Sequence, residues 1–127
     1  VITFDELNEA AFDADDIILQ ATSSSNLPIT FISSDPSIAS VNGTTLTIHK
    51  AGSINITATQ PGNDNYFPAL DVTQTLVILK APQAITFSSI DERVFGSMPF
   101  EVLAESTSGL VVGFESSNPQ VASIEGN

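Results

Sequence analysis

An internal duplication is the feature of this sequence that most restricts its fold. When residues 1–43 are set against residues 84–126, an offset of 85 − 2 = 83, about 16 of the 43 positions are identical without a gap. The run Ile2-Thr3-Phe4, for example, returns as Ile85-Thr86-Phe87. A gapless match of this length indicates that the chain repeats one folding unit.

The duplication predicts how the chain is divided. We expect a complete unit over residues 1–79, a linker over residues 80–83, and the first half of a second unit over residues 84–127. The half-unit has no counterpart of the last strands of the first unit, so an open sheet edge is expected there. Either further residues of the same protein complete it, or another chain donates the missing strands and forms a polymer.

Short alternating runs between turn residues predict β-strands and no long helix. The Asn42-Gly43 pair predicts a tight hairpin, because both central residues of a type I′ turn need a positive φ. A short helical turn is expected only near residues 12–16. The predicted strands of the first unit are 1–4, 17–22, 28–32, 38–41, 45–49, 54–59 and 72–79. About seven such strands predict an all-β protein, a two-sheet β-sandwich with Greek-key connections.

Aromatic residues recur at matched positions, as core residues do. The pairs are Phe4 with Phe87, Phe12 with Phe95, and Phe31 with Phe114. We expect all of them in the core and no exposed aromatic cluster. Tyr66, the single tyrosine, follows a turn, and we expect its ring to pack and its hydroxyl to bond to backbone. The alternative is an exposed ring that stacks on a ligand.

A resemblance to a known family covers nearly the whole chain. The segments that carry it are Ser33–Val41, Asn42-Gly43, Leu46–Ile48 and Ala51–Ala58, which resemble the bacterial immunoglobulin-like (Big) repeats. The wider frame is similar to the MBG-type repeats of large Bacteroidetes surface proteins, through Ile2–Phe4, Gly62–Tyr66, Val72–Leu76 and Lys80–Phe87. The resemblance implies tandem immunoglobulin-like sandwiches in exported adhesins, filaments or enzyme stalks. It implies no catalytic residues.

The charge balance restricts the partners. With 15 Asp and Glu against three Lys and Arg, the net charge is −12. The chain therefore lacks the clustered cations that bind nucleic acid or anionic membranes. No apolar run approaches the roughly 18 residues of a membrane span, so direct membrane insertion is not expected. The expected partners are neighbouring repeats of the same chain and other copies of the chain in a filament, outside the cell or on a bacterial cell surface.

Residues for catalysis or for a cofactor are not recognisable. His49 is the only imidazole and cysteine is absent, so a transition-metal site would depend on carboxylates. The serines cluster in loops, and Gly43, Gly52 and Gly62 stand singly at turns rather than in a phosphate-binding loop. We therefore predict a protein that is not an enzyme and that has no cofactor, with calcium as the one alternative.

Calcium is the one metal for which the sequence offers candidates. Carboxylates crowd the segment between the first two predicted strands, and such oxygen ligands suit Ca²⁺. The candidate ligands are Asp13, Asp15, Asp16 and Asp64. The alternative is a solvated acidic loop that keeps the array soluble, which is favoured because no Asp-x-Asp-x-Asp-Gly loop is present.

Together these features predict a structural spacer or stalk repeat of an adhesin or extracellular filament. The alternative is a carbohydrate- or protein-binding accessory module of a secreted enzyme. The sequence flanking this segment would distinguish the two, since a long run of similar repeats favours the stalk and a neighbouring hydrolase domain favours the accessory module.

Overall fold

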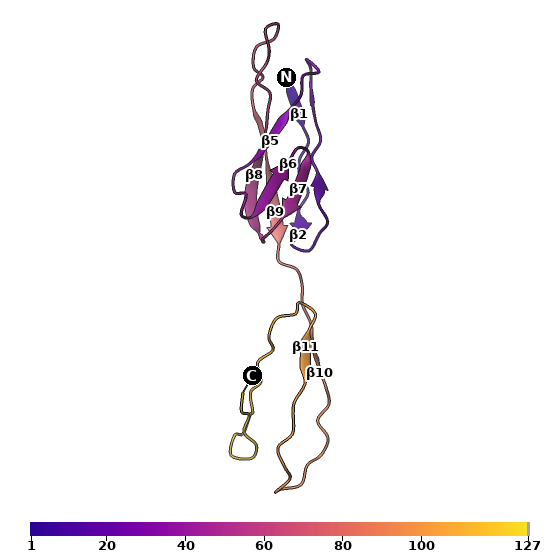
Figure 1. Ribbon diagram of the computed structural model, residues 1–127, viewed down its shortest axis with the longest axis vertical. Coiled ribbons are helices and arrows are strands. Elements are labelled where there is room, and N and C mark those ends of the chain that lie inside the picture. The colour runs from indigo at the N-terminus through magenta and orange to yellow at the C-terminus, as the bar shows by residue number, and fades with distance from the viewer. Residues whose placement is uncertain (127) are drawn as a thin grey trace. The chain divides into compact units, whose positions relative to one another are not determined.

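The structure is a computed structural model that describes residues 1–126 (Figure 1). Every regular element among those residues is a β-strand. The prediction of an all-β protein is therefore confirmed. The chain divides into two compact units, Val1–Ala81 and Pro82–Asn127, and the division falls within the residues predicted as linker.

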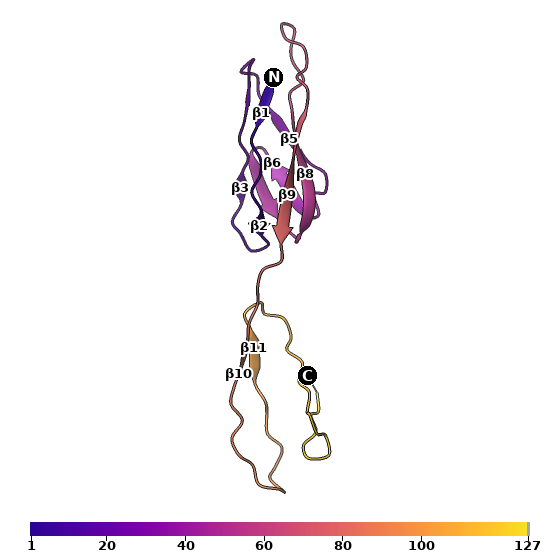
Figure 2. The ribbon, with the colours of Figure 1, turned by 180° about the vertical axis from the view of Figure 1, so that it is seen from behind.

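The strands of the first unit form three sheets (Figures 1 and 2). Strands β2, β9, β8 and β5 make a four-stranded sheet in that order, β3, β7 and β6 make a second sheet, and β1 pairs antiparallel with β4. The bounds are β1 (Ile2–Phe4), β2 (Ala10–Ala11), β3 (Ile17–Ile18), β4 (Ala21–Ser23), β5 (Thr30–Ser33), β6 (Ala39–Asn42), β7 (Thr45–Ile48), β8 (Gly52–Thr59) and β9 (Val72–Leu79).

One core joins these sheets. The alternation of β8 buries Ile54, Ile56 and Ala58 and leaves Ser53 and Asn55 exposed, as the period of two in a strand requires. The buried hydrophobic residues are Ile2, Phe4, Leu19, Phe31, Ala39, Leu46, Ile54, Ile56, Ala58, Leu76 and Ile78. Every sheet of the unit contributes to this set, so the fold is consistent with a β-sandwich.

The strand predicted over residues 17–22 is divided in the structure. Its first part, β3, pairs with β7, whereas its second part, β4, pairs with β1. Leu19 lies between the two parts, where its side chain is buried and its backbone N–H donates to the carbonyl of Thr44 at 2.8 Å. The chain thus changes sheet at Leu19–Gln20, which a continuous apolar pattern does not reveal.

Strand β2 was not predicted, because its two alanines carry no alternation. It pairs in parallel with the end of β9, with Ala11 opposite Leu79. The prediction of a short helical turn near residues 12–16, directly after β2, is wrong. The chain makes a turn closed by the N–H of Ala14 and the carbonyl of Ala11 at 3.1 Å, without a helix. The prediction that Phe12 lies in the core is also wrong, because Phe12 follows the last paired residue of β2 and its side chain is 45% exposed.

The second unit repeats local contacts of the first at the 83-residue offset. Strand β10 (Ile85–Phe87) pairs antiparallel with β11 (Ala104–Ser106), as β1 pairs with β4. The rings of Phe4 and Phe31 lie 5.3 Å apart at 57°, and those of Phe87 and Phe114 lie 5.8 Å apart at 50°. Phe87 is nevertheless 54% exposed and Phe95 is fully exposed, so the prediction that both lie in a core is wrong.

Hydrogen bonds in the turns recur as well. The backbone N–H of Ala39 donates to the carbonyl of Asp35 at 3.1 Å, and that of Ala122 donates to the carbonyl of Asn118 at 3.1 Å. These turns are closed within a few residues of sequence. Local sequence therefore suffices to form them in both units.

Other strands of the first unit have no counterpart in the second. Residues 93–94, 100–101, 113–116 and 122–125 correspond to β2, β3, β5 and β6, yet none of them is a strand. In the first unit each of those four strands pairs with β7, β8 or β9. Strands β1 and β4, which pair with each other, do recur. Strand formation therefore follows the availability of a partner.

Candidate functional site

The candidate site is the loop between β8 and β9, residues 60–71, which we call the tip loop. Its base is closed by the N–H of Ala69, which donates to the carbonyl of Gln60 at 3.0 Å. Gln60 is itself buried at 3% exposure. The base of the loop is thereby anchored to the sandwich, and residues 61–68 extend from it as a narrow hairpin (Figure 1).

Internal hydrogen bonds hold the end of the tip loop. The N–H of Asn63 donates to the carbonyl of Tyr66 at 2.9 Å, and the Asn63 Oδ1 accepts from the N–H groups of Asn65 and Tyr66 at 2.9 and 3.0 Å. Gly62 has a φ of 77°, and a Cβ there would clash with the backbone from Tyr66 to Pro68. The loop therefore needs glycine at this position.

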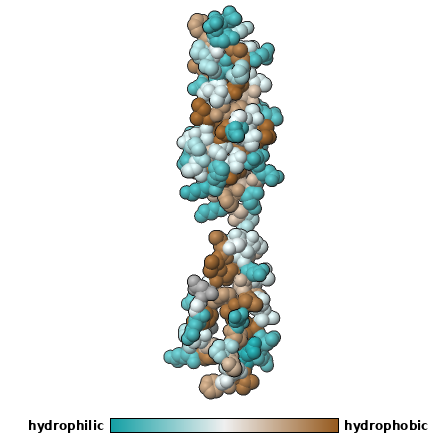
Figure 3. Space-filling view, in the orientation of Figure 1, coloured by the Kyte–Doolittle hydropathy of each residue, from teal (hydrophilic) through white to brown (hydrophobic). Residues whose placement is uncertain are grey.

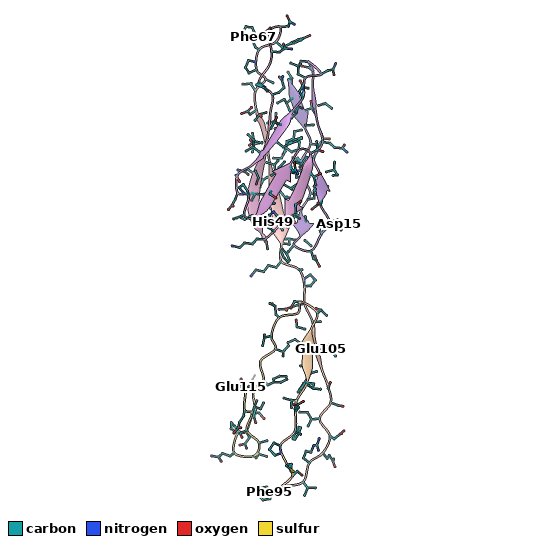
Figure 4. The ribbon with its side chains drawn as sticks, viewed as in Figure 1. Asp15, His49, Phe67, Phe95, Glu105 and Glu115 are labelled. Atoms are coloured by element: carbon teal, nitrogen blue, oxygen red, sulfur yellow. The ribbon has the colours of Figure 1, made fainter. Side chains whose placement is uncertain are left out.

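Large apolar side chains project from this ordered loop into solvent. Phe67 is 95% exposed, Leu70 is 89% exposed and Tyr66 is 54% exposed. Figure 4 labels Phe67 at the extremity of the first unit. The predicted packing of the Tyr66 ring is therefore wrong. Several exposed apolar side chains on one hydrogen-bonded loop make it a candidate binding surface.

The sequence contains a signal for this surface in its turn residues. Pro61, Asn63 and Pro68 mark a loop, and loops run over protein surfaces. Large apolar residues within such a segment, here Phe67 and Leu70, have no strand to place them in the core. Their exposure follows from that position.

The charges around the tip loop are acidic. Asp64 and Asp71 lie within it, and both are exposed. The cations of the chain are Lys50, Lys80 and Arg93, and none of them belongs to the loop. The surface is thus apolar with an acidic border, which suits a neutral or cationic partner.

The calcium candidates do not come together. Asp13, Asp15 and Asp16 are exposed on the β2–β3 connection, which follows the pairing of β2 with the end of β9. Asp15 is labelled in Figure 4. Asp64 lies in the tip loop, before the start of β9. The eight residues of β9 separate the two places by about 23 Å. Among residues 1–126 there is no group of three His, Cys, Asp or Glu side chains that could hold a metal ion. Calcium binding remains a prediction for the β2–β3 connection.

The remaining singled-out polar residues make local contacts. His49 is exposed, and its Nε2 lies 2.7 Å from the hydroxyl of Ser40 on the neighbouring strand. The Asp35 carboxylate accepts from the hydroxyl of Ser37 at 2.6 Å and from its N–H at 2.9 Å. These bonds, the hydroxyl bond first, hold the pKa of Asp35 below its ordinary value. Both residues stabilise turns or strand ends.

One hollow in the first unit is large enough to consider for chemistry. It has a volume of about 560 Å³, opens widely to solvent and is lined by residues 4–11 together with Ala14, Ile17, Ile18 and Gln20. Asp5, Glu6 and Glu9 are its titratable groups, and its lining offers no serine, histidine or lysine to act with them. Carboxylates are therefore the ionisable groups that this hollow presents.

No protein-family model, no curated protein and no solved structure matches this chain. Over residues 1–126, no helix is long and apolar enough to cross a membrane. What the chain does is therefore inferred from its own residues and geometry.

Proposed function

We propose that this chain belongs to a run of immunoglobulin-like units that serves as a spacer or stalk in a secreted or cell-surface protein, such as an adhesin or an extracellular filament. The observation that carries the proposal is the recurrence of the same strand pair, aromatic pair and turn bonds 83 residues apart. A spacer needs this property, because one unit repeated at a fixed period gives a controlled length.

The strand order supports an immunoglobulin-like topology. An immunoglobulin sandwich places its first, second, fifth and fourth strands in one sheet and its third, sixth and seventh in the other. Here β3 and β4 together are counted as the second strand, and β5 to β9 are the third to the seventh. The pairs β1–β4 and β3-β7-β6 then match the first sheet, and β5-β8-β9 matches the second sheet. Strand β2, parallel to β9, is then a continuation of the first strand onto the opposite sheet.

The ends of the first unit also favour a spacer. Strand β1 begins at one end of the unit, and β9 finishes at the other (Figures 1 and 2). Units joined in this way add length at every joint. The linker over residues 80–83 is short and contains Pro82, which restricts bending.

Force spectroscopy on a polyprotein of the first unit tests this proposal. Unfolding one 83-residue repeat should release about 250 Å of contour length, since about 3.5 Å per residue gives about 290 Å and the folded unit spans about 40 Å. We expect a series of equally spaced force peaks. A smooth extension without peaks would rule out a mechanically stable spacer.

A second candidate function is a carbohydrate-binding module, and the exposed Tyr66 and Phe67 favour it. Aromatic faces can stack on sugar rings, and the tip loop is already ordered for binding. Retention of the chain on suspended cellulose and chitin, compared with a Tyr66→Ala/Phe67→Ala variant, tests this function. Retention of the parent chain that the variant loses would support it, and equal behaviour of the two would exclude it.

A further inference from the structure

The hollow lined by residues 4–11 lies where two neighbouring segments of the first unit separate. Strands β1 and β4 pair as far as Phe4 and Ala21. Continued in the same register, this ladder would place Leu7 opposite Ile18. Instead the chain after β1 pairs with β9 through β2, and the chain before β4 pairs with β7 through β3. The hollow of about 560 Å³ lies between the diverging segments, and ligand pockets have volumes of about 300–1,000 Å³.

Both sheets end in an outer strand beside this hollow. Strand β2 is outermost in the four-stranded sheet, and β3 is outermost in the sheet that contains β7 and β6 (Figure 2). The N–H of Leu19 donates to the carbonyl of Thr44, so antiparallel alternation directs the N–H and C=O of Ile18 away from β7. Within residues 1–126, neither these two groups nor the backbone of residues 6–8 has a hydrogen-bond partner. Such groups are a template for another strand.

The two walls of the hollow differ in chemistry. The wall formed by residues 4–11 contributes three exposed carboxylates, those of Asp5, Glu6 and Glu9. The opposite wall includes Ile17 and Ile18, and the side chain of Ile18 is 58% exposed. Figure 3 shows hydrophobic side chains among hydrophilic ones on the surface of the first unit. No Lys, Arg or His of the described chain lines the hollow, so its own lining does not neutralise the carboxylates.

We propose that this hollow is a docking groove for an extended segment of another protein, in which apolar residues alternate with lysine or arginine. The backbone of that segment pairs with the sheet edge at Ile18, as in other cases of strand addition. Successive side chains of a strand point to opposite faces. The apolar residues therefore face inward, toward Phe4 and Ile17, and the cationic residues face outward, where the carboxylates of the groove are exposed.

The charges of the chain argue against a second copy of it as the occupant. Residues 1–127 contain only three cations, Lys50, Lys80 and Arg93, and these are too far apart to alternate along one strand. A second copy would instead bring further carboxylates to the acidic wall, since the net charge is −12. Like charges placed together across an interface are costly. The groove thus favours a basic segment of a different protein.

Titration of the isotope-labelled chain with synthetic peptides, followed by NMR, tests the proposal. The probe is an eight-residue peptide of alternating valine and lysine with blocked ends. The control peptide has the same composition but places all its valines before its lysines, which separates strand docking from unspecific attraction to an acidic chain. On the protein side, Glu6→Lys/Glu9→Lys reverses the charge of the groove. Asp64→Lys/Asp71→Lys makes the same change of charge in the tip loop and is the matched control.

We expect the alternating peptide to shift the amide signals of residues 6–8 and Ile18, and to slow hydrogen exchange at the Ile18 N–H because that group gains a partner. Binding should be at least about 10-fold weaker for the control peptide and for Glu6→Lys/Glu9→Lys, and should change less than about twofold for Asp64→Lys/Asp71→Lys.

Three results would each overturn the docking groove. They are equal binding of the two valine–lysine peptides, equal losses in the two variants, and an absence of shifts at about 1 mM peptide. Circular dichroism checks that both variants are folded. Should Glu6→Lys/Glu9→Lys fail to fold, the comparison of the two peptides on the parent chain decides by itself.

Discussion

Replacing Phe4 by alanine is the sharpest test of the core, because the chain contains its own matched control. Phe4 is 5% exposed, and its ring lies 5.3 Å from that of Phe31. Truncation of a buried phenylalanine costs about 3–5 kcal/mol through lost burial and the cavity it leaves. We expect Phe4→Ala to lower the free energy of unfolding of the first unit by about 4 kcal/mol.

Phe87→Ala is the control. Phe87 occupies the matched position and has the same kind of aromatic partner, Phe114, at 5.8 Å, but it is 54% exposed. Less than half of its surface is buried, and removing it leaves no closed cavity. The cost within the second unit is therefore about 1 kcal/mol. The unfolding of the first unit should not change, because the substitution is outside it.

Guanidinium denaturation followed by far-ultraviolet circular dichroism measures both variants. For a unit of this size the slope is about 2 kcal/mol/M, so Phe4→Ala should lower the midpoint by about 2 M. Phe87→Ala should leave the main transition in place. Equal shifts from the two variants, or a loss below about 1 kcal/mol for Phe4→Ala, would refute the assignment of the closed core to the first unit.

Four further substitutions probe the turns and the contact between β9 and β1, each measured by chemical denaturation. Gly43→Ala should lower the free energy of unfolding by about 1 kcal/mol, because φ at this position is 63°. Gly62→Ala should lower it by more, because the added Cβ would also clash with the backbone from Tyr66 to Pro68. The hydrogen bonds from Ser37 lower the pKa of Asp35 in the folded chain below the ordinary value of 3.8. The ionised Asp35 carboxylate therefore stabilises the fold above pH 3.8, and this stabilisation is lost as the pH falls through the lower pKa of the folded state. Asp35→Asn should therefore lose less stability on acidification than the parent chain. Gln74→Ala should cost about 1 kcal/mol, because a part-buried hydrogen bond of 2.8 Å to β1 is removed.

The features that the sequence predicted well are local ones. A tight hairpin joins β6 and β7 at the predicted place, and β9 has the predicted bounds. The predicted type I′ turn is wrong, because Asn42 pairs with Thr45 and the central residues are Gly43 and Thr44, of which only Gly43 has a positive φ. Hydrophobic alternation also identified the inward side chains of β8. For the candidate site, turn residues marked the tip loop as a loop, but they did not predict that the side chains of Tyr66 and Phe67 project into solvent.

Taken alone, the sequence determined the class of fold, the period of 83 residues and the side chains suited to a core. The tertiary structure decided which of these segments become strands. Phe31 and Phe114 sit in closely related segments, yet residues 30–33 form β5 and residues 113–116 form no strand. The reason is that apolar alternation depends on neighbours in sequence, whereas a strand exists only when a distant segment satisfies its backbone N–H and C=O groups.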